Sequence, residues 1–261
     1  MRLARTSWRA TGWLILMVGL AEASATSRKS HAASELQVVP AGIALPVQFS
    51  RTLRAGKTTP GTVVVVETTQ RVPVSVDSYL NRGVKVRGTV VASTPGDGTA
   101  AHPSVLTLRF SELEYRGRTV PIVTRAVAVA NLMAVDDTFL PATGAIDKGN
   151  SNPANWTTKQ VGGDEVCRSG WVGDVVDTAT RKVGTADFYG VYSLPVRIGE
   201  GKGGLVPKAM GVFSTTAKGL YGYEHGATLE SAAGSMTITS PEKQAVIRNG
   251  DNLLLEVLPS R

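Results

Sequence analysis

The fold is decided by the stretch from Val38 to Ala130. It begins VVPAGIALPVQFSRTL (38–53), continues through GTVVVVET (61–68) and GVKVRGTVVAS (83–93), and ends VLTLRFSELEYRGRTVPIVTRAVAVA (105–130). Apolar residues alternate with polar or small ones along much of it, and a period of two is typical of a strand with one buried face. Six such strands separated by turn residues predict a small barrel or sandwich.

The last segment of this stretch predicts a hairpin with an irregular strand. Apolar residues fall on even positions from Leu106 to Phe110 and on odd positions from Leu113 to Tyr115. One extra residue in a strand produces such a change of parity, so we expect a β-bulge near Ser111–Glu112. Arg116–Gly117 predicts the tight turn that follows.

Working outward, the rest of the chain indicates more β structure and one irregular region. The 261 residues include 28 glycines and 13 prolines, with 42% hydrophobic and 19% charged residues. This composition favours a globular protein of many short strands. We expect an all-β fold: a barrel or sandwich at 37–132, a long irregular segment at 133–185, and a second β unit at 186–261.

Residues 1–25 have the layout of a secretory signal peptide. Three arginines precede an apolar run from Trp13 to Ala21, and Ala23-Ser24-Ala25 forms a small-x-small cleavage pattern. The run is shorter than the ~20 residues of a membrane-spanning helix. We therefore expect an exported protein, periplasmic or extracellular, with a flexible tether at 26–36 and no transmembrane helix in the mature chain.

The formal net charge of +7 is dispersed along the chain. A nucleic-acid-binding surface concentrates its charge and adds stacking rings, and this sequence does neither, so we expect no nucleic-acid partner. The basic balance allows a weak preference for anionic polymers of the envelope. The expected partners are an envelope polysaccharide or an envelope protein.

Catalytic candidates are few. Cys167 is the single cysteine, which excludes an internal disulfide. The leading interpretation of Cys167 is a small, half-buried apolar residue. As a nucleophile it would lie in a glycine-rich stretch of the kind where reactive residues occur, with His225 beside Glu224 as the best candidate base. Three scattered histidines and one cysteine fit no metal-ligand spacing, and the segment at 199–204 lacks the Ser or Thr of a phosphate loop. No metal or cofactor is expected.

The candidate binding residues lie in the irregular segment. They are Trp156, Trp171, Asp164 and Glu165, because long segments without regular structure often carry function and aromatic side chains suit binding surfaces. Further aromatic residues suited to a carbohydrate surface follow in the sequence, at Phe188, Tyr189, Tyr192, Tyr221 and Tyr223.

Glycine turns precede strands at Pro40 to Gly42, Gly61–Thr62 and Gly83 to Val90, and a hairpin closes the series at Leu106 to Ile122. In this arrangement the chain resembles a β-module common in exported bacterial proteins of unassigned function. It is more distantly similar to the C-terminal β-barrel of the core channel proteins of conjugation and type IV secretion systems. That channel family carries a helical antenna in its barrel, and this sequence has no equivalent apolar helix.

Three functional hypotheses follow. The leading one is a non-catalytic binding or structural module of the cell envelope. The second is a hydrolase, either Cys-dependent or acting on glycans. The third is a subunit of a secretion or adhesion assembly. A Cys167 that is buried and far from His225 and from every carboxylate would exclude the Cys-dependent enzyme. Burial of both Trp156 and Trp171 would remove the main support for the binding surface.

Overall fold

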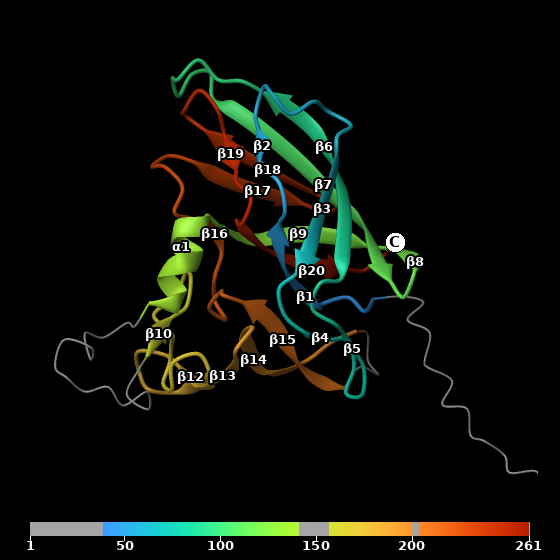
Figure 1. The fold of residues 1–261 in the computed structure, drawn as a ribbon, viewed down its shortest axis with the longest axis vertical. Helices are drawn as coiled ribbons and strands as arrows, with labels where there is room; N and C mark the ends of the chain where they lie inside the picture. Colours follow the sequence, from blue (N-terminus) through green and yellow to red (C-terminus); the bar gives the residue numbers. More distant parts are fainter. Residues whose placement is uncertain (1–38, 141–156, 200–203, 261) are drawn as a thin grey trace, which may run out of the picture. The chain divides into compact units, whose positions relative to one another are not determined.

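Strands make up most of the regular structure in residues 39–140, 157–199 and 204–260, which the computed structural model describes (Figure 1). Ten of them form one large sheet. In chain order they are β1 (Ala44–Phe49), β3 (Val63–Thr68), β6 (Lys85–Thr94), β7 (Ser104–Tyr115), β8 (Arg118–Pro121), β9 (Val123–Ala130), β16 (Gly219–Tyr221), β17 (Thr228–Ala232), β18 (Ser235–Ser240) and β20 (Asn252–Leu258).

The large sheet is a nearly closed barrel. Its order is β16-β9-β20-β1-β3-β6-β7-β18-β17, with β8 beside β7, and every pair is antiparallel except β9 with β16. The two ends of this order meet at β9. There the Ala126 N–H donates to Ser231 Oγ of β17 at 2.8 Å, and the Gly234 N–H donates to the Thr124 carbonyl at 2.7 Å.

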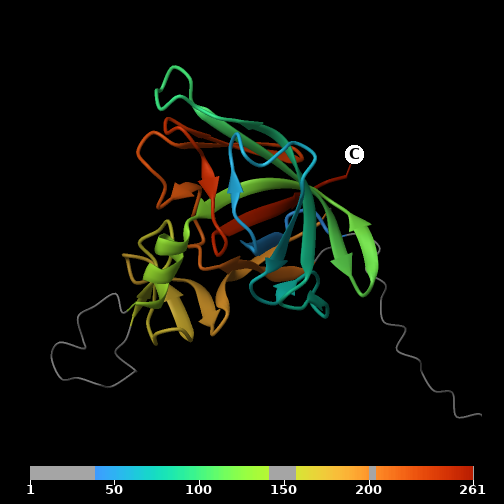
Figure 2. The ribbon, with the colours of Figure 1, turned by 45° about the horizontal axis from the view of Figure 1, so that its top comes forward.

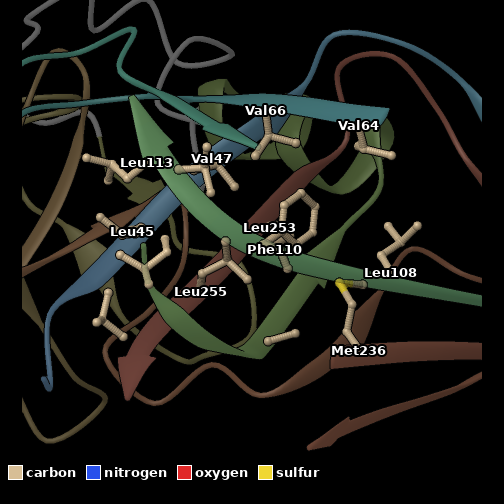
Figure 3. Close-up of a cluster of buried hydrophobic side chains, with 14 of the residues drawn as sticks. Leu45, Val47, Val64, Val66, Leu108, Phe110, Leu113, Met236, Leu253 and Leu255 are labelled. Carbon is tan, nitrogen blue, oxygen red and sulfur yellow. The ribbon is translucent and has the colours of Figure 1, made fainter. Parts of the chain in front are cut away.

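Alternating side chains fill the inside of the barrel (Figure 3). Along β3, Val64 and Val66 are fully buried while Val63 is exposed. The rings of Phe49 and Phe110 meet edge to face with their centroids 6.2 Å apart. Burial of such apolar area is the main favourable term in folding, so this interior accounts for much of the stability of the barrel.

Strand β20 is buried on both faces. Leu253 and Leu255 point into the barrel, whereas Leu254 belongs to a second apolar cluster on its outer side. The sequence NLLLEVL is nearly continuous in apolar residues, as expected for a strand covered on both sides. It lies between β1 and β9, which come from the first half of the chain.

A second sheet of six strands, the small sheet, follows in the sequence. Its strands are β10 (Thr158–Lys159), β11 (Val166–Cys167), β12 (Gly173–Val176), β13 (Lys182–Asp187), β14 (Gly190–Arg197) and β15 (Leu205–Gly211). They are paired in chain order. The small sheet curls until its ends meet, because the Val161 N–H donates to the Val212 carbonyl and the Ser214 N–H to the Val161 carbonyl, both at 2.8 Å.

The small sheet packs on the outside of the barrel (Figures 1 and 2). Ala44, Ala128 and Leu254 of the barrel share an apolar cluster with the small sheet, whose contribution includes Cys167, Val175, Val191 and Met210. This second core is the reason that β20 is buried on both faces.

Short elements complete the described fold. Helix α1 (Leu132–Asp136) and the 3₁₀ turn η1 (Asp137–Phe139) follow β9, and Asn131 caps α1 through a bond from the Ala134 N–H to its Oδ1 at 2.9 Å. Two small ribbons pair β2 (Leu53–Arg54) with β19 (Val246–Ile247) and β4 (Val72–Pro73) with β5 (Tyr79–Leu80). No helix among the described residues is long and apolar enough to cross a membrane.

The predicted fold class is confirmed: the protein is all-β, with a barrel-like sheet and a second β unit. The predicted bulge is also present, since Arg87 pairs with Glu112 and Gly88 with Phe110, which leaves Ser111 without a partner on β6. The assignment of chain segments to the two β units differs from the prediction. Strands β16, β17, β18 and β20 complete the barrel, and the described end of the segment expected to be irregular forms β10 to β13.

Candidate functional site

Four exposed aromatic side chains surround one hollow at the small sheet, which we call the aromatic hollow. Its empty volume, open side included, is about 360 Å³, and its lining includes residues of η1, β10, the β11–β12 loop and the β13–β14 hairpin. The aromatic residues and their exposed fractions are Phe139 (49%), Trp171 (45%), Phe188 (72%) and Tyr189 (55%). A group of large apolar side chains left in water at a concave site indicates a binding surface.

Phe188 and Tyr189 form the tip of the hairpin between β13 and β14. Asp187 Oδ1 fixes this tip, because it accepts hydrogen bonds from the Tyr189 N–H at 2.8 Å and from the Gly190 N–H at 3.0 Å. Gly190 has φ +154°, and a Cβ there would lie 2.1 Å from Gln70 Oε1. Only glycine permits this close approach, so the hairpin tip lies against Gln70, which follows β3 of the barrel.

A cation from another part of the chain contacts the same tip. The guanidinium of Arg82, in the turn before β6, lies 4.8 Å from the centre of the Tyr189 ring. This distance is within the range of a cation–π interaction. Arg82 therefore holds the Tyr189 ring and brings a positive charge to the edge of the aromatic hollow.

Trp171 lies in the loop between β11 and β12 of the small sheet. Gly170 next to it is buried and is held by a hydrogen bond from Thr158 Oγ1 to its carbonyl at 2.9 Å. Thr157 and Gly170 also form a parallel bridge. The backbone on the N-terminal side of Trp171 is therefore fixed by β10 while the indole remains half exposed.

Polar groups in the wall of the aromatic hollow are already engaged. Thr138 Oγ1 donates to the Val135 carbonyl at 2.7 Å, and Gln160 Nε2 donates to the Thr158 carbonyl at 3.1 Å. The Asp187 carboxylate is used by the hairpin tip. The hollow thus offers mainly apolar ring surface, together with the hydroxyl of Tyr189 and the indole N–H of Trp171.

Cys167 is not placed for nucleophilic chemistry. It is fully buried in the second core. Burial raises the pKa of its thiol above the usual value, and the Asp174 carboxylate raises it further. A nucleophilic cysteine needs the thiolate and access to substrate, and Cys167 has neither. His225 lies instead in the exposed turn between β16 and β17, whereas Cys167 lies in β11 within the second core.

The two acidic candidates differ in role. Glu165 is buried, and its carboxylate accepts hydrogen bonds from the Thr215 N–H at 2.8 Å and from Thr215 Oγ1. It therefore holds the loop after β15 to the β10–β11 turn. Asp164 is exposed in that turn. Neither residue lines the aromatic hollow. Trp156, the remaining candidate, lies outside the described residues.

The structure brings Trp171, Phe188 and Tyr189 together, although the sequence places them in different segments. Sequence reasoning missed Phe139, Arg82 and Gln70. One local signal for the hairpin tip exists: Asp187-Phe188-Tyr189-Gly190 places two aromatic residues between turn residues. No group of three or more metal-binding side chains occurs in the described ranges.

Comparisons with protein-family models, with curated proteins and with solved structures gave no match to this chain.

Proposed function

We propose that this protein is an exported, non-catalytic binding module of the cell envelope and that the aromatic hollow binds an envelope polysaccharide. The observation that carries the proposal is the group of four exposed aromatic side chains around one shallow hollow. Buried aromatic residues need no functional explanation, but four exposed at one concave site do.

The chemistry of the hollow suits a sugar. A sugar ring has an apolar C–H face and a polar rim, and an aromatic side chain supplies apolar surface for the face. The Tyr189 hydroxyl and the Trp171 indole N–H supply hydrogen-bonding groups for the rim. A pocket that is mostly apolar, with a few polar groups that fix orientation, is the usual form of a small-ligand site.

The hairpin tip adds preorganisation. Asp187 and the close approach of Gly190 to Gln70 hold Phe188 and Tyr189 before any ligand arrives. Side chains on a fixed backbone lose less conformational freedom on binding, so more of the contact energy contributes to affinity. Residues 1–25 hold three arginines and one glutamate, so the chain without them carries a net charge of +5 (+7 minus +2), which further favours an acidic polysaccharide over a neutral one.

Co-sedimentation with insoluble peptidoglycan and titration with soluble acidic polysaccharides test the proposal. Trp171→Ala and Phe188→Ala are each expected to lower the affinity at least tenfold, while the exposed aromatic Tyr79→Ala, which lies outside the hollow, leaves it unchanged. Circular dichroism of each variant checks the fold. The proposal fails if no polysaccharide binds, or if Trp171→Ala and Tyr79→Ala have the same effect.

A second candidate function, a subunit of an envelope assembly, is favoured by the surface of α1 and η1. Leu132, Met133, Phe139 and Leu140 are all exposed there. Exposed apolar residues on neighbouring elements also suit a protein interface. Met133→Ser tests it, because Met133 lies outside the aromatic hollow: loss of a cross-linked partner with polysaccharide binding intact would favour the assembly.

A further inference from the structure

A crevice opens between the barrel and the small sheet, away from the aromatic hollow. One wall is the outer face of β1, β9 and β20, and the other is formed by β13, β14 and β15, with the loop at 215–218 at one side. Its empty volume, open side included, is about 1120 Å³. The two lining sets share no residue, so the crevice and the aromatic hollow are separate sites.

The floor of the crevice is apolar and continues the second core. Ala44 and Leu254 on the barrel and Met210 on β15 belong to both. Val183 and Leu194 extend the apolar surface outward, and Leu194 remains 45% exposed. The two layers therefore separate before their apolar faces are fully covered, and leave a strip of apolar surface for another molecule.

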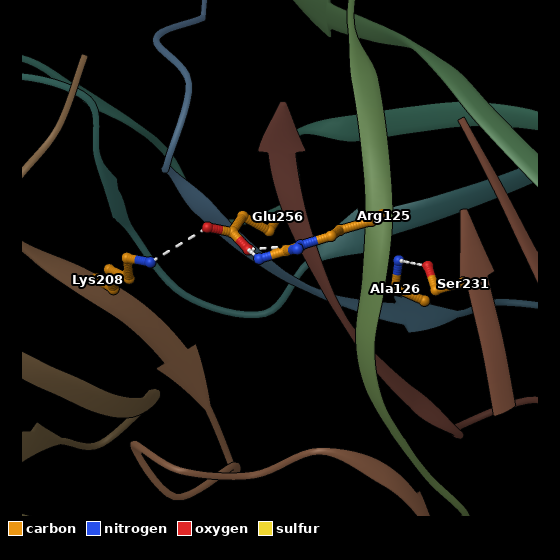
Figure 4. Close-up of polar contacts among 5 residues, drawn as sticks. All are labelled: Arg125, Ala126, Lys208, Ser231 and Glu256. Atoms are coloured by element: carbon orange, nitrogen blue, oxygen red, sulfur yellow. Dashed lines mark hydrogen bonds and ion pairs between the residues drawn. The ribbon is translucent and has the colours of Figure 1, made fainter. Parts of the chain in front are cut away.

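The mouth of the crevice is charged. Arg125 of β9 pairs directly across the sheet with Glu256 of β20, and its Nε and Nη2 lie 2.8 and 2.5 Å from Glu256 Oε2 (Figure 4). Lys208 of β15 reaches across from the small sheet to Glu256 Oε1 at 3.4 Å. Lys218 also lines the crevice.

These groups leave a positive mouth. Two cations, Arg125 and Lys208, share the single carboxylate of Glu256, and Lys218 forms no ion pair with any other residue in the described part of the chain. The longer Lys208 contact leaves that ammonium able to turn toward a second anion at small cost, because partly exposed ion pairs are worth ~1 kcal/mol or less. The crevice combines an apolar floor with a cationic mouth.

We propose that this crevice binds a single-chain amphiphile with an anionic headgroup. The acyl chain lies along Leu194, Met210 and Leu254, and the headgroup lies between Lys208 and Lys218. Charge complementarity selects the anion, and apolar area removed from water supplies the affinity. A fatty-acid carboxylate and a lysophospholipid phosphate share this chemistry. The proposal does not depend on polysaccharide binding at the aromatic hollow.

The test is fluorescence titration of the full chain with cis-parinaric acid, followed by displacement. Saturable binding is expected, with laurate or lysophosphatidylglycerol displacing the probe at least tenfold more effectively than neutral dodecanol. Displacement by one anion only would support the proposal and identify its source. Absence of saturable binding, or equal displacement by dodecanol, would overturn it.

A pair of variants locates the binding site. Leu194→Asp places a negative charge on the floor and is expected to weaken probe binding at least tenfold. Leu205→Asp makes the same change at a leucine that is 60% exposed on the same sheet but outside the crevice, and is expected to have no effect. Lys218→Met, a change at the surface, should weaken the displacement of the probe by laurate and leave its displacement by dodecanol unchanged. Equal loss in the two Asp variants would contradict the assignment.

Discussion

The side-chain oxygen of Gln70 accepts a hydrogen bond from the backbone N–H of Gly211 at 2.7 Å, and this contact joins the two sheets. Gln70 follows β3 of the barrel, and Gly211 ends β15 of the small sheet. The amide Nε2 of Gln70 donates to the Val191 carbonyl at 3.1 Å, and Gln70 itself is fully buried. One side chain thus satisfies a donor and an acceptor of the small sheet where water has no access.

Replacement of Gln70 by leucine is expected to destabilise the protein by roughly 2–4 kcal/mol, because it leaves two buried backbone groups without partners. Gln48→Leu is the matched control. Gln48 is exposed and bonds the Gly250 carbonyl at 3.2 Å, so water replaces the bond and the change stays within about 0.5 kcal/mol. Urea unfolding measures both. Equal losses would show that Gln70 does not join the sheets in the way described.

The crossing of β15 over β1 depends on Gly211. Its φ is +66°, and a Cβ there would lie 2.8 Å from the Cβ of Pro46. Gly61 has φ +84° and nothing within 4 Å of the added Cβ. Gly61→Ala should therefore cost about 1 kcal/mol for the backbone conformation alone. Gly211→Ala should cost a further ~1–3 kcal/mol because the methyl group overpacks against Pro46. Unfolding midpoints that agree for the two variants would rule out a tight contact between the sheets.

Local pattern was enough to predict much of the barrel. The continuous β-branched run at Val63–Val66 identifies β3, the alternation in β6 and β7 identifies those strands, and the change of parity locates the bulge at Ser111. The turn at Arg116–Gly117 is also as predicted, since both residues have positive φ. Each of these features is set by neighbouring residues, which a sequence displays directly.

Pairing between strands that are far apart in the sequence leaves no pattern that the sequence displays. Strand β20 lies between β1 and β9, and the apolar run at Leu253–Leu255 indicates only that it is buried on both faces. In the small sheet, β10 and β11 are two residues each and β12 is four. Strands of this length are too short to establish a period, so the region was predicted to be irregular.

The candidate site was predictable in part for the same reason. Trp171, Phe188 and Tyr189 are recognisable as aromatic residues in turns, but the hollow exists only because β10 to β15 curl and η1 adds Phe139. The burial of Cys167 could not be predicted from its neighbours in the sequence. Its glycine-rich surroundings indicate an accessible loop, whereas the strand pairing of β11 buries it in the second core.

Burial of Cys167 gives a prediction about its reactivity. Because its pKa is raised and the thiol lies in the second core, labelling by Ellman's reagent at pH 8 should require opening of the small sheet. The labelling rate should therefore rise steeply with urea below the unfolding transition. A Cys167→Ser, Ser169→Cys double variant is the control, since Ser169 is exposed in the adjacent loop and should react without urea. Fast labelling of native Cys167 would contradict its placement.

Tyr192, on β14, gives a prediction about alkaline pH. Burial, and next the Asp187 carboxylate, raise its pKa to about 12, and its hydroxyl donates to the Arg71 carbonyl at 3.1 Å. A tyrosine in the unfolded chain titrates near ~10. Between these values the unfolded chain has lost the proton that the folded chain keeps, so stability falls as pH rises through this window. Tyr192→Phe should make that fall shallower in urea unfolding from pH 9 to 11.5 and should remove a late-titrating component from the absorbance at 295 nm. Burial also raises the pKa of Tyr223. Because Tyr223 is present in both the parent protein and the Tyr192→Phe variant, its contribution cancels when the two are compared. Identical pH slopes would place the Tyr192 hydroxyl in solvent and not against Arg71.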